Sequence, residues 1–198
     1  MKNAILTLLM LCSVSLVACK KNDALNEDTD YSGYPRTSVP KELISPTKYW
    51  QLGILASGNF YDSYNSTYKD GAGGTYLFYD FNEDGTFTAL MYLKATSSYG
   101  ETRQSWTETK GTLVVGDTTI SGNNYKTISL HPATGTDRMV VNYGSETKKK
   151  LTQSDFKART LLKAKYICGD YVKDGKKYLD LLRIDEGPEI LFSLHEEY

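Results

Sequence analysis

From Thr47 onward, apolar and polar residues alternate with a period of two, which is typical of half-buried β-strands. Clusters rich in glycine, asparagine and aspartate separate these runs, and such clusters favour tight hairpins because they tolerate positive φ. The pattern predicts nine strands, over residues 48–56, 74–81, 86–95, 105–115, 125–132, 137–144, 164–172, 176–185 and 189–195.

One helix start interrupts the strands. Thr152 carries a hydroxyl, and Asp155 places a carboxylate three residues later, just before the run "FKARTLLK". This spacing satisfies the first unpaired amide groups of a helix. The sequence therefore predicts an all-β fold with one short helix, an antiparallel up-and-down meander of eight or nine strands. Residues 47–198 suit a single domain of this kind.

Several of these strands resemble a known family. The runs "YWQLG", "YLFYDFNEDGTFTALMYL", "SWTETKGTLVV" and "TISLHP" are similar to the lipocalin-like lipoproteins common in Bacteroidetes. The resemblance implies a lipocalin-like β-barrel. True lipocalins carry G-x-W in their first strand, whereas Trp50 here precedes Gly53. The resemblance also implies that Arg183 reaches over Trp50, and an exposed arginine on an edge strand is the alternative.

The N-terminus has the pattern of a secretory signal. Lys2 precedes an apolar run that is too short to span a bilayer, so residues 1–18 are predicted to be a signal peptide. The run ends in Leu-Val-Ala-Cys, which resembles the bacterial lipobox, and this implies lipidation of Cys19. Two or three acyl chains would anchor the protein stably. The alternative is an ordinary signal peptide that happens to end beside a cysteine.

Residues 19–46 are predicted to be a lipidated N-terminus followed by a flexible tether. Residues 20–46 contain few large aliphatic side chains, charges of both signs and three prolines. Such a composition does not bury enough apolar surface to become ordered. The expected location is the outer membrane or the cell surface, and the periplasmic face of the membrane is the alternative.

Net charge and cysteine content reduce the range of possible functions further. The chain has 23 basic and 24 acidic residues, and residues 1–18 contain only Lys2 among them, so the remaining chain has a net charge of −2. No excess of positive charge attracts nucleic acid. Once Cys19 is lipidated, Cys168 has no cysteine partner, and its apolar surroundings predict a buried, inert thiol.

The stretch from Asp80 to Gly85 matches the start of a calcium-binding loop, D-x-[DN]-x-[DN]-G. The position that should supply a bidentate glutamate is Met91, and the flanking residues alternate as strands where the full motif requires helices. We therefore expect a hairpin turn, with Gly85 in the left-handed conformation, and no metal site.

No motif in the sequence predicts catalysis. His131 and His195 have no partner at zinc-ligand spacing, and the sequence contains no G-x-S-x-G and no phosphate-binding loop. We expect a protein that is not an enzyme and has no cofactor.

The chain has sixteen tyrosines against six phenylalanines. Aromatic rings with a polar rim suit sugar rings, amphiphilic ligands or protein interfaces, and tyrosine also covers half-wet sheet faces. The candidate ligand-binding residues are Trp50, Tyr61, Tyr64, Tyr76, Tyr92 and Trp106. Two hypotheses remain: a barrel that binds a small hydrophobic or glycan-like molecule, with the 57–74 loop at its mouth, and an accessory lipoprotein with a filled barrel and an envelope protein partner.

Overall fold

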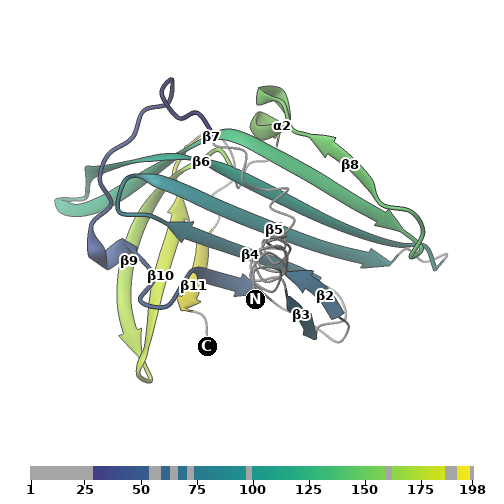
Figure 1. The fold of residues 1–198 in the computed structure, drawn as a ribbon. Helices are drawn as coiled ribbons and strands as arrows, with labels where there is room; N and C mark the ends of the chain where they lie inside the picture. The colour runs from purple at the N-terminus through teal and green to yellow at the C-terminus, as the bar shows by residue number, and fades with distance from the viewer. Residues whose placement is uncertain are drawn as a thin grey trace, which may run out of the picture.

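The fold is known from a computed structural model, which describes residues 29–53, 59–62, 67–70, 74–96, 100–158, 162–185 and 191–196. Long antiparallel strands dominate it, with one short α-helix (Figure 1). The strands are β1 Trp50–Gly53, β2 Asn59–Asp62, β3 Thr67–Asp70, β4 Gly74–Phe81, β5 Thr86–Thr96, β6 Thr102–Ile120, β7 Asn123–Val141, β8 Thr147–Lys150, β9 Lys165–Lys173, β10 Lys176–Arg183 and β11 Leu191–Glu196. The helices are the 3-10 helix η1 Lys41–Leu43 and α2 Gln153–Ala158.

Nine of these strands form one antiparallel sheet in the order β6-β5-β4-β1-β11-β10-β9-β7-β8. Because β6 also pairs with β7, eight strands close into a ring and β8 remains as an extra edge strand. The predicted all-β meander with one short helix is thus confirmed as a barrel-like fold. Strands β2 and β3 form a separate two-stranded sheet within the range that we expected to be a loop.

The two runs predicted at 125–132 and 137–144 belong to one continuous strand, β7. The residues between them do not turn the chain. Thr134, Gly135 and Thr136 pair with β6, and a β-bulge lies at Ala133, where the register against β6 shifts between Lys110 and Gly111. Such a bulge accommodates an extra residue while the strand continues. The turn between β6 and β7 lies at Ser121 and Gly122, within the gap expected between residues 115 and 125, and both residues have positive φ, as a tight hairpin requires.

The main core lies inside the ring. One buried residue from each ring strand belongs to a single apolar cluster: Trp50, Leu77, Phe87, Leu113, Ile128, Tyr166, Leu179 and Leu194. Because a single face of every strand meets in this cluster, that face is the inside of the barrel. The opposite face of each strand points outward, since neighbouring side chains alternate.

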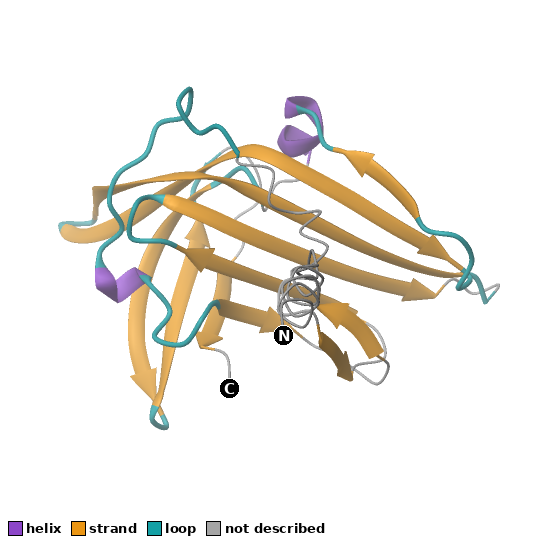
Figure 2. Cartoon of the chain, in the orientation of Figure 1, coloured by secondary structure: helices purple, strands orange, loops and turns teal. Residues whose placement is uncertain are grey.

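The segment before β1 packs against the barrel, so the tether predicted over residues 20–46 is wrong in its C-terminal part. The amide of Thr37 donates to the carbonyl of Leu113 at 3.1 Å, and the amide of Val39 donates to Glu83 at 3.1 Å. Val39 and Leu43 are buried in the interior cluster. Figure 2 shows this segment, which we call the strap (residues 35–44), as a loop that contains η1. Burial of these two apolar side chains, together with the backbone hydrogen bonds, holds the strap against the barrel.

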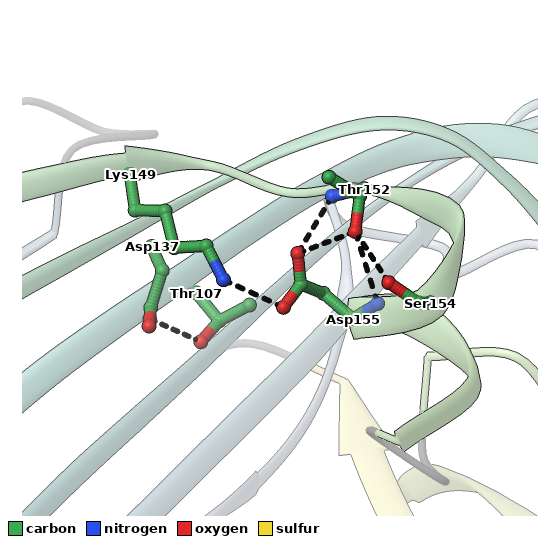
Figure 3. A network of polar contacts seen from close by, with 6 residues as sticks. All are labelled: Thr107, Asp137, Lys149, Thr152, Ser154 and Asp155. Carbon is green, nitrogen blue, oxygen red and sulfur yellow. Dashed lines mark hydrogen bonds and ion pairs between the residues drawn. The ribbon is translucent and has the colours of Figure 1, made fainter.

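The predicted helix cap is confirmed. The Thr152 hydroxyl accepts a hydrogen bond from the Asp155 amide at 3.3 Å, and the Asp155 carboxylate accepts one from the Thr152 amide at 2.8 Å. Lys149 on β8 reaches the same carboxylate at 2.7 Å (Figure 3). This reciprocal arrangement starts α2 and ties it to the edge strand.

In the part of the chain that the structure describes, no helix has the length and apolar character needed to cross a membrane.

Candidate functional site

A second apolar cluster lies on the outer face of β4, β5 and β6. Tyr76 pairs with Tyr92, and Tyr92 pairs with Trp106, so three predicted ligand residues form one row across three strands. The cluster consists of Tyr49, Tyr76, Phe78, Leu90, Tyr92 and Trp106. The structure therefore brings together three of the six side chains that the sequence marked as candidates.

The aromatic rings of this cluster are tightly packed. Tyr49 stacks on Phe78 with ring centroids 4.6 Å apart, and the centroids of Tyr92 and Trp106 are 5.4 Å apart. The exposed fraction rises from 0% at Tyr92 to 8% at Trp106. Burial also raises the pKa of the Tyr92 phenol, which stays neutral and able to donate.

Two glutamines supply polar contacts at the edge of the cluster. The Tyr76 hydroxyl donates to Oε1 of Gln51 at 3.0 Å. The amide nitrogen of Gln104 donates to the Tyr92 hydroxyl at 3.3 Å. Amide groups among aromatic rings fix the orientation of the rings and offer further hydrogen bonds to a polar ligand.

Trp106 and Arg138 make a cation–π contact on the outer face. They are register partners on β6 and β7, and the guanidinium carbon lies 5.6 Å from the indole centroid. Nη2 of Arg138 is paired with Glu146 at 2.9 Å. The indole Nε1 and the Arg138 Nε are both buried and have no hydrogen-bond partner among the described residues. Unpaired buried donors cost about 1–3 kcal/mol each, so an acceptor that reaches them is favoured.

Trp50 does not belong to this site. It faces the inside of the barrel, exposes 0% of its surface, and is separated from the outer cluster by the sheet itself. Nζ of Lys177 lies 5.6 Å from its ring centroid. Arg183, which was expected over Trp50 or exposed at an edge, is 4% exposed and is paired with Asp185.

The interior leaves no space for a ligand beside its central residues. Trp50, Leu113, Tyr166, Leu179 and Leu194 all have an exposed fraction of 0%. A side chain that lined a water-sized void would retain accessible surface toward it. The part of the barrel that these residues line is therefore filled by side chains, as small barrels commonly are.

The other predicted ligand-binding and lipidation residues have no described side chains. Tyr61 belongs to strand β2, and the structure describes its backbone but not its side chain. Tyr64 and the predicted lipidation site Cys19 also lie outside the described residues. Cys168 is buried inside the barrel as predicted, and burial raises the pKa of its thiol to about 12.

The calcium-like stretch is the turn between β4 and β5. Gly85 has φ of +82°, and its amide donates to the Asn82 carbonyl at 3.0 Å. The Asp84 carboxylate accepts from both the amide and the hydroxyl of Thr86, at 3.0 and 2.7 Å. The hairpin expected for this stretch is thus observed. Among the described residues, no three His, Cys, Asp or Glu side chains gather as a metal-binding group.

Sequence analysis missed Arg138 and Gln104. Arg138 is placed opposite Trp106 by the register of β7 against β6, and that register depends on the bulge beside Lys110. A strand predicted to begin at residue 137 carries no information about this pairing. Gln104 precedes the predicted start of its strand, although its position two residues before Trp106 places both side chains on one face.

The chain matches no family model, no curated protein and no solved structure.

Proposed function

We propose that this protein is a membrane-anchored lipoprotein of the cell envelope that binds a glycan-like or small hydrophobic ligand on the outer face of its barrel. The observation that carries the proposal is the pair of buried, unpartnered N–H donors of Trp106 and Arg138, beside Tyr92 and Gln104. The outer face is favoured over the inside of the ring as the binding site, because the central interior side chains have no exposed surface.

The chemistry of the site fits a ligand with both polar and apolar parts. The indole N–H and the guanidinium Nε–H suit hydroxyl or carbonyl oxygens, while the indole and the Arg138 stem offer apolar contact. The Arg138 side chain is 22% exposed, so the site opens to solvent at this residue. Movement of this long side chain would expose the indole edge, and the ligand would take its place.

Native mass spectrometry of the protein isolated from its own host tests the proposal. We expect a small molecule to co-purify with the wild type and to be lost from Trp106→Phe, which keeps an aromatic ring but removes the N–H donor. Thr118→Ala, at a half-buried position of β6 beyond the cluster, is the control and should retain the molecule. Equal retention by both variants would exclude Trp106 as the binding residue.

A second candidate is an accessory lipoprotein that acts through a protein partner. The closely packed centre of the barrel favours it, because such a protein needs no ligand cavity. Crosslinking in the host envelope followed by affinity purification distinguishes the two. Capture of one partner protein by the wild type, with no co-purifying small molecule, would favour this candidate.

The lipid anchor is tested separately with Cys19→Ala. The variant should leave the membrane fraction and remain folded, because Cys19 precedes the strap by more than ten residues. A Cys19→Ala protein that still sediments with membranes would refute lipidation at this residue. Surface proteolysis of intact cells then separates the outward-facing location from the periplasmic one.

A further inference from the structure

Positive charge is concentrated in one stretch of this chain. Residues 146–165 contain seven lysines or arginines and two acidic residues, although the whole chain has a net charge of −1. The stretch covers β8, α2 and the start of β9. Its exposed lysines are Lys148, Lys149, Lys150, Lys157, Lys163 and Lys165. We call this region the β8–α2 basic surface.

The acidic groups of this surface are already engaged. Asp155 accepts a hydrogen bond from Lys149 at 2.7 Å, and hydrogen bonds from Lys149 and Thr152 hold the pKa of its carboxyl well below the ordinary value. Glu146 is paired with Arg138 at 2.9 Å. Each of the two acids is thus paired with a single base, and the seven basic residues of the stretch leave the surface positive.

The strap places the tether beside this surface. The hydroxyl of Tyr34, just before the strap, accepts a hydrogen bond from the Gln153 side chain at 3.3 Å. The same side-chain nitrogen donates to the carbonyl of Pro132 on β7 at 3.1 Å. Gln153 is the first residue of α2, so the chain enters the barrel next to the basic surface (Figure 1).

The distance from the lipid anchor to this point is limited. Ten residue steps separate Cys19 from Thr29, where the described chain begins. Even a fully extended chain spans at most about 3.6 Å per residue, or roughly 36 Å. Strand β6 alone has 19 residues, a length of about 60 Å at 3.3 Å per residue. Strand β6 is therefore longer than the fully extended segment between Cys19 and Thr29, so this segment limits how far the basic surface can move away from the membrane.

We propose that the β8–α2 basic surface docks on the anionic phospholipid headgroups of the membrane that holds the anchor. This inference rests on the lipid anchor at Cys19 proposed above. Phosphate-bearing headgroups complement lysines on a solvent-exposed edge strand, and attraction of this kind decays within a Debye length. Docking fixes the orientation of the barrel relative to the membrane.

Lysine footprinting on the intact lipoprotein tests the proposal. The purified protein is inserted into vesicles of phosphatidylcholine alone or with 30% phosphatidylglycerol, and its amines are acetylated. On the anionic vesicles, Lys148, Lys150 and Lys157 should be labelled at least threefold more slowly than on neutral vesicles. Lys173 and Lys176, on the hairpin between β9 and β10, are the internal control and should be labelled equally on both.

Charge reversal gives the matched variants. Lys148→Glu/Lys150→Glu should remove the protection of Lys157 on anionic vesicles, whereas Lys173→Glu/Lys176→Glu should preserve it. Raising the salt concentration to 0.5 M should have the same effect as the first variant. Equal labelling of the basic surface on both vesicle types would overturn the docking proposal while leaving the anchor intact. Failure of the wild type to insert into either vesicle would instead refute the anchor.

Discussion

The indole nitrogen of Trp50 donates a hydrogen bond of 2.8 Å to the carbonyl oxygen of Leu43, seven residues earlier in the chain. This bond ties the first strand of the barrel to η1, and the side chain of Leu43 enters the interior cluster. The strap is therefore part of the folded domain.

We expect Leu43→Ala to lower the free energy of unfolding by about 2–5 kcal/mol, because it leaves a cavity in a fully packed region. Urea denaturation followed by tryptophan fluorescence measures the change. Leu191→Ala, at a residue that is 64% exposed, is the control and should shift the free energy by less than about 0.5 kcal/mol. A small effect at Leu43 would mean that the strap is not bound to the barrel in solution.

Alanine substitutions at Gly85 and Gly122 separate the stability cost of backbone strain from that of a steric clash. Both have nearly the same φ, +82° and +83°. A Cβ at Gly85 would lie 2.3 Å from the Thr37 carbonyl oxygen, whereas a Cβ at Gly122 would meet nothing within 4 Å. Gly122→Ala should cost about 1 kcal/mol from the positive φ alone. Gly85→Ala should cost at least 1 kcal/mol more, because it also displaces the strap, and thermal unfolding of both variants would show the difference.

The capping carboxylate of α2 should give the domain an acid-sensitive component. Hydrogen bonds from Lys149 and Thr152 lower the pKa of Asp155 in the folded state. The stabilisation is therefore complete above the unfolded-state pKa of about 3.9 and is lost as the pH falls below it. The difference in unfolding free energy between wild type and Asp155→Asn should be constant from pH 6 to 8 and shrink toward pH 2. A difference that grew on acidification would contradict this assignment.

Cys168 should resist thiol reagents in the native protein. Burial inside the barrel raises its pKa to about 12, so almost no thiolate exists at pH 8. Absorbance with a disulfide reagent should show slow labelling that becomes fast in 6 M urea. Rapid labelling without denaturant would show that the strands around Cys168 open readily.

The local rules of the sequence predicted most strand positions. The strand predicted at 74–81 agrees with β4, and the turns at Gly85 and Gly175 follow from their glycines and preceding aspartates. The break predicted between the runs 125–132 and 137–144 was wrong, because the chain forms a bulge between Pro132 and Thr134 and the strand continues. A bulge is stabilised by the partner strand, which short-range signals do not contain.

The candidate site was predictable only in part. Tyr76, Tyr92 and Trp106 share a face because alternation and hairpin register bring them together. Alternation does not reveal which face of the sheet becomes the inside of the ring, and for that reason Trp50 was grouped with them. The packing of the strap against the core was also not predicted. Its overall composition is polar, and only two of its side chains are buried in the interior cluster.

The closure of the ring has a kinetic consequence. Among the described residues, β1 and β11 are joined by only two register pairs, Trp50 with Glu196 and Gln51 with His195. The two strands lie nearly at opposite ends of the domain sequence, so their pairing closes the longest loop in the fold and is entropically the most expensive contact to form. The β6–β7 hairpin, by contrast, pairs over eighteen positions through a two-residue turn. The amides along β1 and β11 should therefore exchange with solvent before those of β6 and β7. We expect the barrel to begin unfolding where β1 pairs with β11.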